Sequence, residues 1–289
     1  MTQDHPVVLS EAVRFDLPAK SGAAPYRIFL RTPPGDAPPE GWPVLYMLDG
    51  NAVFATAADA IRVQAAWPLG TGVREAAVVA IGYPTEAAYD SVRRSWDYSP
   101  PPGATYPPHV AGGPDVLTGG ADEFLAFIEE TLKPEISRRL PVNPARQAIF
   151  GHSFGGLFVL YALFNHPEAF ATWTAASPTV YWENFTLLRS AERFEARADR
   201  PSGKRVLISV GEYEQTLAPF QVGAEDEEKR RAGHERSRTE ENARAMSERL
   251  AAMDDLEVSY ELIPCETHMT VLPTAINQAI RFAFGAWIR

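Results

Sequence analysis

The sequence predicts an α/β protein in which helices flank a mostly parallel, doubly wound central sheet. Short apolar runs, typical of strands buried on both faces, alternate along the chain with segments of helical spacing. One apolar run ends in a Gly-x-Ser-x-Gly pattern at 151–155, where a strand would pass through a sharp turn into a helix. Repeated β and α units of this kind indicate a parallel sheet with helices on both faces.

The first half of the chain supplies three expected strands and two expected helices. Side chains alternate between apolar and polar at 26–32, which predicts a strand, and the continuous apolar runs 44–48 and 77–81 predict two buried ones. Helical spacing predicts helices over 52–66 and 121–140. We expect Pro134 to kink the second helix or to end its first half.

The second half continues the same alternation. A strand leads into the Gly-x-Ser-x-Gly pattern, and a helix over 157–165 follows it, ended by His166 and Pro167. Apolar runs then predict strands, and a last segment of helical spacing predicts the closing helix. The expected strands are 171–176, 205–210 and 257–263, and the expected helix is 272–284.

Composition limits the class of protein. The 289 residues contain no linker pattern, so we expect a single domain over 1–289. A net charge of −10 without a Lys/Arg run argues against nucleic acid as a partner. The single cysteine, Cys265, excludes an internal disulfide and a cysteine-based metal cluster. With no apolar stretch of membrane-spanning length and no signal-peptide pattern at 1–9, we expect a cytoplasmic protein that does not enter a membrane.

Two segments interrupt the alternation. Residues 83–117 are rich in Pro and Gly, and a connection of that length without regular structure of its own is typical of a binding loop, so we expect it on the substrate side. Residues 212–249 carry dense mixed charge. We interpret this charged insert as a solvated loop and helix face, with a mobile lid as the alternative.

The Gly-x-Ser-x-Gly pattern predicts a nucleophile elbow centred on Ser153. We expect Gly151 and Gly155 to be required because strand and helix backbones approach there, leaving no room for a side chain. The turn would point the Ser153 hydroxyl outward, beside the N–H groups at the start of the following helix.

A serine hydroxyl needs a base to take its proton, and His268 is the best-placed histidine. It follows the last expected strand and precedes the closing helix, which is where this chain order requires a base. His152, beside the serine, is expected to pack next to the site instead. Cys265 fits a strand end better than a nucleophile. The remaining histidines lie in the tail, the Pro-rich loop, a helix end and the charged run: His5, His109, His166 and His234.

The acid that orients the base should follow the strand 205–210, where two glutamates are in range. We favour Glu214, with Glu212 as the alternate acid and a serine–histidine dyad as a further possibility. For the oxyanion we expect two backbone N–H donors: that of Phe154 and that of Gly50 or Asn51.

These segments together resemble the esterase-D-like esterase family of α/β hydrolases. The similarity runs from about residue 26 to the end of the chain, and it is greatest to the branch of siderophore esterases, which hydrolyse catecholate trilactones such as enterobactin, salmochelins and bacillibactin. The charged insert after Glu214 departs from the family pattern. The motifs that carry the resemblance are 46–51, 93–100, 151–156, 177–182, 211–214 and His268.

The resemblance implies a role for the Pro-rich loop. A ferric tri-catecholate is strongly anionic, so a protein of net charge −10 needs local cations, for which Arg93 and Arg94 are candidates. Aromatic rings would stack on catechols; the candidates are Trp96, Tyr98 and Trp182. Alternatively, one arginine pairs with Asp97 and the aromatic rings belong to the core.

The resulting functional prediction is a serine esterase that needs no metal or organic cofactor; any iron would arrive with the substrate. Other acyl esterases remain open, namely a feruloyl or acetyl esterase or an S-formylglutathione hydrolase. So do an acyltransferase, in which an alcohol replaces water, and a non-catalytic binding protein of the same fold. We expect Asp49 to serve in a turn or cap, because no partner ligands for a metal accompany it.

Overall fold

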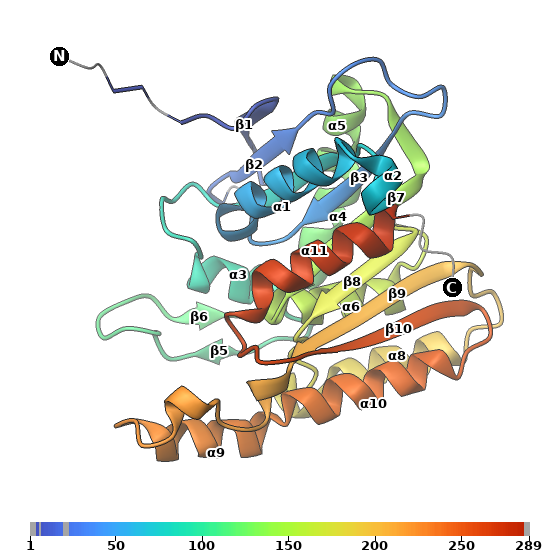
Figure 1. The fold of residues 1–289 in the computed structure, drawn as a ribbon. Helices are drawn as coiled ribbons and strands as arrows, with labels where there is room; N and C mark the ends of the chain where they lie inside the picture. Colours follow the sequence, from blue (N-terminus) through green and yellow to red (C-terminus); the bar gives the residue numbers. More distant parts are fainter. Residues whose placement is uncertain (1–3, 6, 20–22, 286–289) are drawn as a thin grey trace.

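The computed structural model describes residues 4–5, 7–19 and 23–285. An eight-stranded sheet runs through the centre of the molecule in the order β1-β2-β4-β3-β7-β8-β9-β10 (Figure 1). Its strands are β1 (Ala12–Leu17), β2 (Tyr26–Arg31), β3 (Trp42–Met47), β4 (Ala77–Gly82), β7 (Val142–His152), β8 (Thr172–Ala176), β9 (Lys204–Gly211) and β10 (Leu256–Ile263).

The sheet is mostly parallel, which confirms the predicted fold class. From β4 to β10 every neighbouring pair of strands is parallel. Only β1 and β2 break the pattern, because β1 pairs antiparallel with β2 and β2 antiparallel with β4. All residues of β3, β4 and β8 are buried, as expected of strands covered on both faces.

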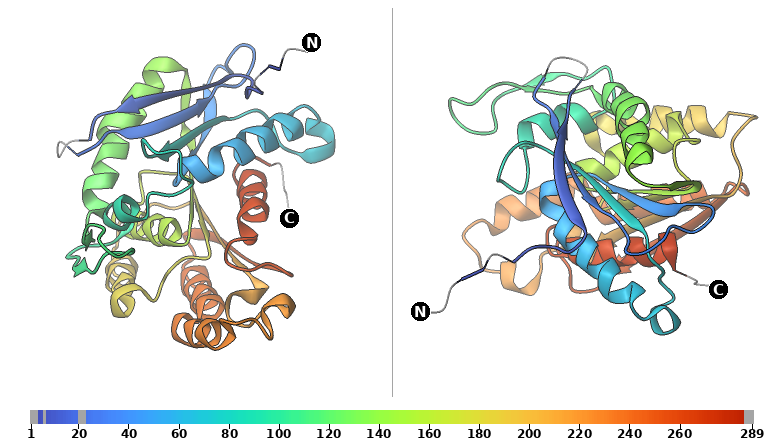
Figure 2. Two further views of the ribbon diagram at one scale, coloured as in Figure 1. Left: turned by 90° about the vertical axis from the view of Figure 1, so that its left-hand side faces the viewer. Right: turned by 90° about the horizontal axis from the view of Figure 1, so that it is seen from above.

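Two apolar cores lie on opposite faces of the sheet. On one face α1 (Gly50–Ala65) and α11 (Val271–Phe284) pack against alternate side chains of the central strands, among them Leu45 and Phe150. On the other face Tyr46 and Ile149 of the same strands meet a larger set of helices, and Figure 2 shows the two groups on either side of the sheet. The larger set is α4 (Ala121–Phe127), α6 (Phe154–Asn165), α8 (Leu187–Glu195) and α10 (Thr239–Ala251).

The expected helix over 121–140 is continuous but irregular. It consists of α4, a π-helical turn η1 (Ile128–Leu132) and α5 (Lys133–Arg139). Pro134 lies in the first turn of α5, directly after the π-helical turn, so it does not end the helix, but the α-helical hydrogen bonding is interrupted just before it.

The expectation that 83–117 has no regular structure of its own is wrong. The segment contains α3 (Ser91–Tyr98), whose first turn is capped by the Asp90 carboxylate, and a small hairpin of β5 (Thr105–Tyr106) with β6 (Val116–Leu117). The short length of these elements, between runs of Pro and Gly, concealed them. Strand β1 was also missed, although Val13, Phe15 and Leu17 alternate with polar residues, and Phe15 and Leu17 pack against the core.

Four helical elements follow β9 in the charged insert, the last of them α10. The turns η2 (Glu212–Glu214) and η3 (Pro219–Gln221) lead to α9 (Glu227–Ser237), which precedes α10. The remaining short helices are α2 (Pro68–Thr71) and α7 (Trp182–Phe185).

Candidate active site

Ser153 occupies a strained turn between β7 and α6. Its backbone angles, φ 60° and ψ −116°, lie outside the regions that non-glycine residues ordinarily adopt. A β-carbon at Gly151 would overlap the Gly155 carbonyl, so this glycine is required by close approach, as expected. The same expectation for Gly155 is wrong: a β-carbon there would meet Leu48 at 3.4 Å, an ordinary contact. Gly156 is the tighter position, because a β-carbon there would lie 3.0 Å from the Ala176 carbonyl oxygen.

Three side chains that follow the carboxyl ends of β7, β9 and β10 form one hydrogen-bonded chain. His268 Nε2 lies 3.0 Å from the Ser153 hydroxyl oxygen, and His268 Nδ1 lies 2.6 Å from Glu214 Oε2. If Nδ1 carries the proton and donates it to the carboxylate, Nε2 is left with a lone pair facing the serine hydroxyl. The arrangement can therefore remove a proton from Ser153.

Glu214 is held in place by further donors. Its side chain is 1% exposed, and its Oε1 accepts hydrogen bonds from the Gly211 N–H at 2.8 Å and from the Ser177 hydroxyl. Glu212 points elsewhere: its Oε2 accepts the Cys265 N–H at 2.7 Å. Of the two glutamates singled out from the sequence, it is Glu214 that contacts His268.

The His152 ring lies beside that of His268. Its ring centroid is 4.7 Å from that of His268, and its Nε2 is 2.8 Å from the His268 carbonyl oxygen. Burial, reinforced by the neighbouring His268, lowers the pKa of His152 to about 3. The ring is therefore neutral at physiological pH, and because a carbonyl only accepts, Nε2 must carry its proton.

The turn from β3 to α1 supplies the other expected oxyanion donors. Asp49 has a left-handed conformation (φ 56°), and its N–H donates to the Tyr98 hydroxyl at 3.1 Å. The Asn51 side chain is engaged in fixing the end of β4, because it accepts the Tyr83 N–H at 2.9 Å. Gly50 and Asn51 are the first two residues of α1, so their backbone N–H groups have no acceptor within the helix. Phe154 is the first residue of α6, so its N–H also has no acceptor within its helix.

Arg94 makes a two-pronged ion pair with Asp49. Its Nε and Nη2 lie 2.9 and 2.8 Å from the two carboxylate oxygens. Burial alone would lower the pKa of Arg94, but the attraction of Asp49 raises it above its ordinary value. The guanidinium carbon also lies 5.9 Å from the centre of the Phe154 ring. Arg94 is therefore already paired with a carboxylate, and its role as a cation for the substrate stays a prediction.

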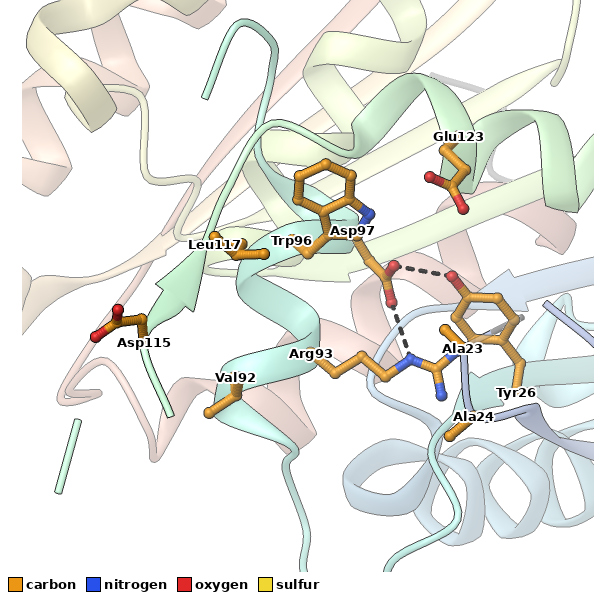
Figure 3. A pocket seen from close by; sticks show the side chains of 10 residues that line it. All are labelled: Ala23, Ala24, Tyr26, Val92, Arg93, Trp96, Asp97, Asp115, Leu117 and Glu123. Atoms are coloured by element: carbon orange, nitrogen blue, oxygen red, sulfur yellow. Dashed lines mark hydrogen bonds and ion pairs between the residues drawn. The ribbon is translucent and has the colours of Figure 1, made fainter. Parts of the chain in front are cut away.

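Arg93 lines a pocket of about 260 Å³ together with Tyr26 and Asp97 (Figure 3). Its guanidinium carbon lies 4.2 Å from the centre of the Tyr26 ring, its Nη1 donates to the Pro25 carbonyl at 2.8 Å, and its Nε is 3.9 Å from Asp97. For Arg93 the alternative interpretation is therefore the correct one: this arginine pairs with Asp97 and packs on a buried aromatic ring. Trp96 lines this pocket too.

Tyr98 cannot stack on a substrate ring, which corrects the expectation from the sequence. Its side chain is fully buried, with the ring against Phe124 and Phe158 and the hydroxyl bonded to the Asp49 N–H.

A pocket of about 480 Å³ adjoins the elbow through Phe154. Trp182 lines it and packs edge-on against Phe154, with ring centroids 4.5 Å apart, and Arg94 reaches it from α3. Tyr106 and His109 of the β5–β6 hairpin complete this wall, although nothing in the spacing of the sequence singled out Tyr106. We call this space the aromatic pocket.

Helix α9 of the charged insert is exposed to solvent. None of the α9 residues is buried, and α9 lies at the periphery, beyond α10 (Figure 1). Its charges pair along the helix, as in Arg230 with Asp226 and Arg231 with Glu227. These pairs fit the interpretation as a solvated helix face for α9, whereas α10, in the same insert, buries Ala243, Met246 and Leu250 in the core.

Within the described residues, no three His, Cys, Asp or Glu side chains gather as metal ligands would. The same part of the chain holds no helix both long and apolar enough to cross a bilayer.

Comparison with known proteins places this geometry in context. A family described as "Putative esterase" matches residues 21–250. The chain is 37% identical to the ferri-bacillibactin esterase BesA of Bacillus subtilis, over 89% of its own length and 84% of that protein. It is 36% identical to a siderophore enterobactin esterase of Emericella nidulans, over 89% of each. The crystal structure of the BES protein from Bacillus cereus superposes with a TM-score of 0.85, 30% identity and coverage of 99% and 100% of the two chains.

Proposed function

We propose a substrate and a mechanism from one premise: the chain belongs to the esterase family that it matches, and it is a hydrolase with the α/β-hydrolase fold. The proposed reaction is hydrolysis of the backbone ester bonds of a catecholate siderophore. The observation that carries the proposal is the hydrogen-bonded chain from Ser153 through His268 to Glu214, beside an aromatic pocket.

In the proposed first half-reaction, the Ser153 oxygen attacks the ester carbonyl carbon while His268 Nε2 takes its proton. The carbonyl π electrons move to oxygen, which the N–H of Phe154 and that of Gly50 or Asn51 stabilise. When the tetrahedral intermediate collapses, the C–O bond to the alcohol breaks and His268 returns the proton to the leaving alkoxide. Glu214 holds the imidazolium in place throughout.

In the second half-reaction, water attacks the acyl-enzyme. His268 now accepts a proton from water and gives it to the Ser153 oxygen as the acyl C–O bond breaks. The products are a free carboxylic acid and the regenerated enzyme. No step draws on a metal or organic cofactor.

The substrate class rests on two observations. The relatives at 37% and 36% identity carry the names ferri-bacillibactin esterase and siderophore enterobactin esterase. The aromatic pocket offers the rings of Trp182, Tyr106 and Phe154, on which flat catechol rings would pack. The expected cytoplasmic location stays a prediction.

A side-by-side turnover assay tests the proposal. With ferric enterobactin, a feruloyl ester and S-formylglutathione at matched concentrations, we expect the highest kcat/KM for ferric enterobactin. The Ser153→Ala variant should lose turnover of all three. A preference for the feruloyl ester or the thioester would replace the siderophore with one of those substrates, and residual turnover by Ser153→Ala would remove the mechanism.

A further inference from the structure

We propose that His152 and Glu212 are positioning residues that hold the segment 264–270, which carries His268, from its two sides. We call this segment the histidine turn. The inference rests on the proposed function, because it assigns these side chains a role in placing the base of that reaction.

The histidine turn has little packing of its own to fix it. It follows β10, the edge strand of the sheet, and Cys265 within it adopts a left-handed backbone (φ 62°). The His268 side chain is 43% exposed, and Met269 beside it is 54% exposed. Within the turn, the Thr267 N–H donates to the Thr270 hydroxyl oxygen at 2.8 Å. The position of the imidazole therefore depends on the bonds that hold the turn's backbone as well as on its own bonds to Glu214 and Ser153.

His152 holds the turn from the elbow side. The Nε2–H of this buried, neutral ring donates to the His268 carbonyl oxygen at 2.8 Å. Because His152 precedes Ser153 directly, the bond connects the backbone of the base to the strand end that carries the nucleophile. A neutral ring at this place also adds no positive charge beside the imidazolium that forms on His268 during the reaction.

Glu212 holds the turn from the side of β9. Its carboxylate accepts the Cys265 N–H at 2.7 Å, and the adjacent Tyr213 N–H donates to the Glu266 carbonyl at 2.8 Å. A bond from an N–H to an ionised carboxylate is stronger than one between neutral groups. Since Glu214 lies on the same turn η2, this contact fixes the base relative to the acid that orients it.

Catalysis depends steeply on such placement. A displacement of the reacting groups by about 1 Å can lower the rate by about 100-fold even when the chemical groups are unchanged. Loss of either anchor is therefore expected to reduce kcat more than it changes KM, because the aromatic pocket that binds the ester is untouched.

The test for His152 compares two amides that differ by one methylene. The amide nitrogen of glutamine reaches as far as His Nε2 and can donate to the same carbonyl, whereas that of asparagine is too short. We expect His152→Asn to lower kcat for 4-nitrophenyl acetate by about tenfold or more with KM nearly unchanged, and His152→Gln to stay within about threefold of the parent. The matched pair His166→Asn and His166→Gln, at the half-exposed end of α6, should leave kcat unchanged.

The test for Glu212 uses the same logic. Glu212→Gln keeps an oxygen that can accept the Cys265 N–H, and Glu212→Ala does not. We expect the alanine variant to lose about tenfold in kcat and the glutamine variant to retain most of it. The downfield proton resonance of the His268 Nδ1–H, which reports its bond to Glu214, should weaken in His152→Asn and Glu212→Ala and persist in the glutamine variants.

Equal kcat values for the asparagine and glutamine variants at 152, whether both normal or both low, would overturn the role of His152. Equal values for alanine and glutamine at 212 would do the same for Glu212. If Ser153→Ala retains turnover in the same assay, the proposed function fails instead. If Ser153→Ala is inactive while the anchor variants match the parent, only the positioning inference fails.

Discussion

At the scale of single residues, Glu212 and Glu214 are identical side chains that differ in burial and in hydrogen-bond partners. They lie two positions apart on one short turn, and both accept hydrogen bonds from or near the segment that carries His268. Only Glu214 is buried. Gly211 and Ser177 donate to one of its carboxylate oxygens, and the other oxygen is left to contact His268.

This difference predicts opposite outcomes for the same substitution. Glu214→Gln should lower kcat by about 100-fold or more, because an amide no longer favours the His268 tautomer with its proton on Nδ1. Glu212→Gln should stay within about threefold, since its oxygen still accepts the Cys265 N–H. Steady-state kinetics with 4-nitrophenyl acetate measure both. The reverse order would make Glu212 the acid.

Much of the candidate site could be predicted at this scale. Ser153, Glu214 and His268 follow from their order along the chain and from their positions after expected strands. Tyr98 could not be assigned, because a fully buried tyrosine and a ring exposed to substrate look alike in sequence. His152 does pack beside the site, as expected, but its bond to the His268 carbonyl could not be predicted, because that residue lies 116 positions later.

At the scale of elements, α3 connects the aromatic pocket to the β3–α1 turn. Neighbouring positions on a helix point in different directions, and so Arg93 reaches Tyr26 and Asp97 while Arg94 reaches Asp49. The divergence depends on α3 being a helix. An irregular loop, as the Pro and Gly content predicted, gives no basis for separating the two arginines.

Arg94→Ala should therefore impair hydrolysis of every ester, including a small neutral one. It leaves the buried Asp49 carboxylate without its partner next to the expected oxyanion donors, at a cost of about 3–5 kcal/mol in unfolding free energy. Arg93→Ala should have a smaller effect on kcat for 4-nitrophenyl acetate, since its contacts lie in the other pocket. Urea unfolding and kinetics of both variants measure this.

The double variant Asp49→Asn with Arg94→Met is the control for that prediction. It removes both charges, so it should recover part of the stability lost in Arg94→Ala. If Arg94→Ala weakens turnover of a ferric catecholate alone and leaves the neutral ester unaffected, Arg94 contacts substrate rather than supporting the turn.

At the scale of the whole molecule, His152 predicts a pH dependence of stability. Its folded pKa is about 3 against an ordinary 6.5. Between these values the unfolded chain binds a proton that the folded protein does not, so unfolding free energy falls as the pH falls. From pH 7 to pH 4 this residue accounts for a loss of up to about 3 kcal/mol.

The His152→Gln variant lacks this titrating group, so its unfolding free energy should fall less over the same range. Urea unfolding of the parent and the variant at pH 7, 5.5 and 4 measures the difference. Parallel curves for the two proteins would show that His152 takes up its proton in the folded state as readily as in the unfolded one.

The parallel pairing of the central strands is what the sequence pattern indicates, since buried apolar runs joined by helices form a doubly wound sheet. The strand at the antiparallel edge was overlooked, because β1 is short and three of its six residues are exposed. The alternation of Val13, Phe15 and Leu17 with polar residues is the signal that could have identified it, and β2 supplies its pairing partner.

The position of β10 at the edge of the sheet has a consequence for the order in which activity and fold are lost on heating. Edge strands pair on one side only and open at lower free energy than central ones. Because β10 leads directly into His268, partial fraying there would separate the base from Ser153 while the interior strands remain intact. Hydrolysis should then decline at a lower temperature than far-UV circular dichroism, and amide hydrogens of β10 should exchange with solvent before those of β7.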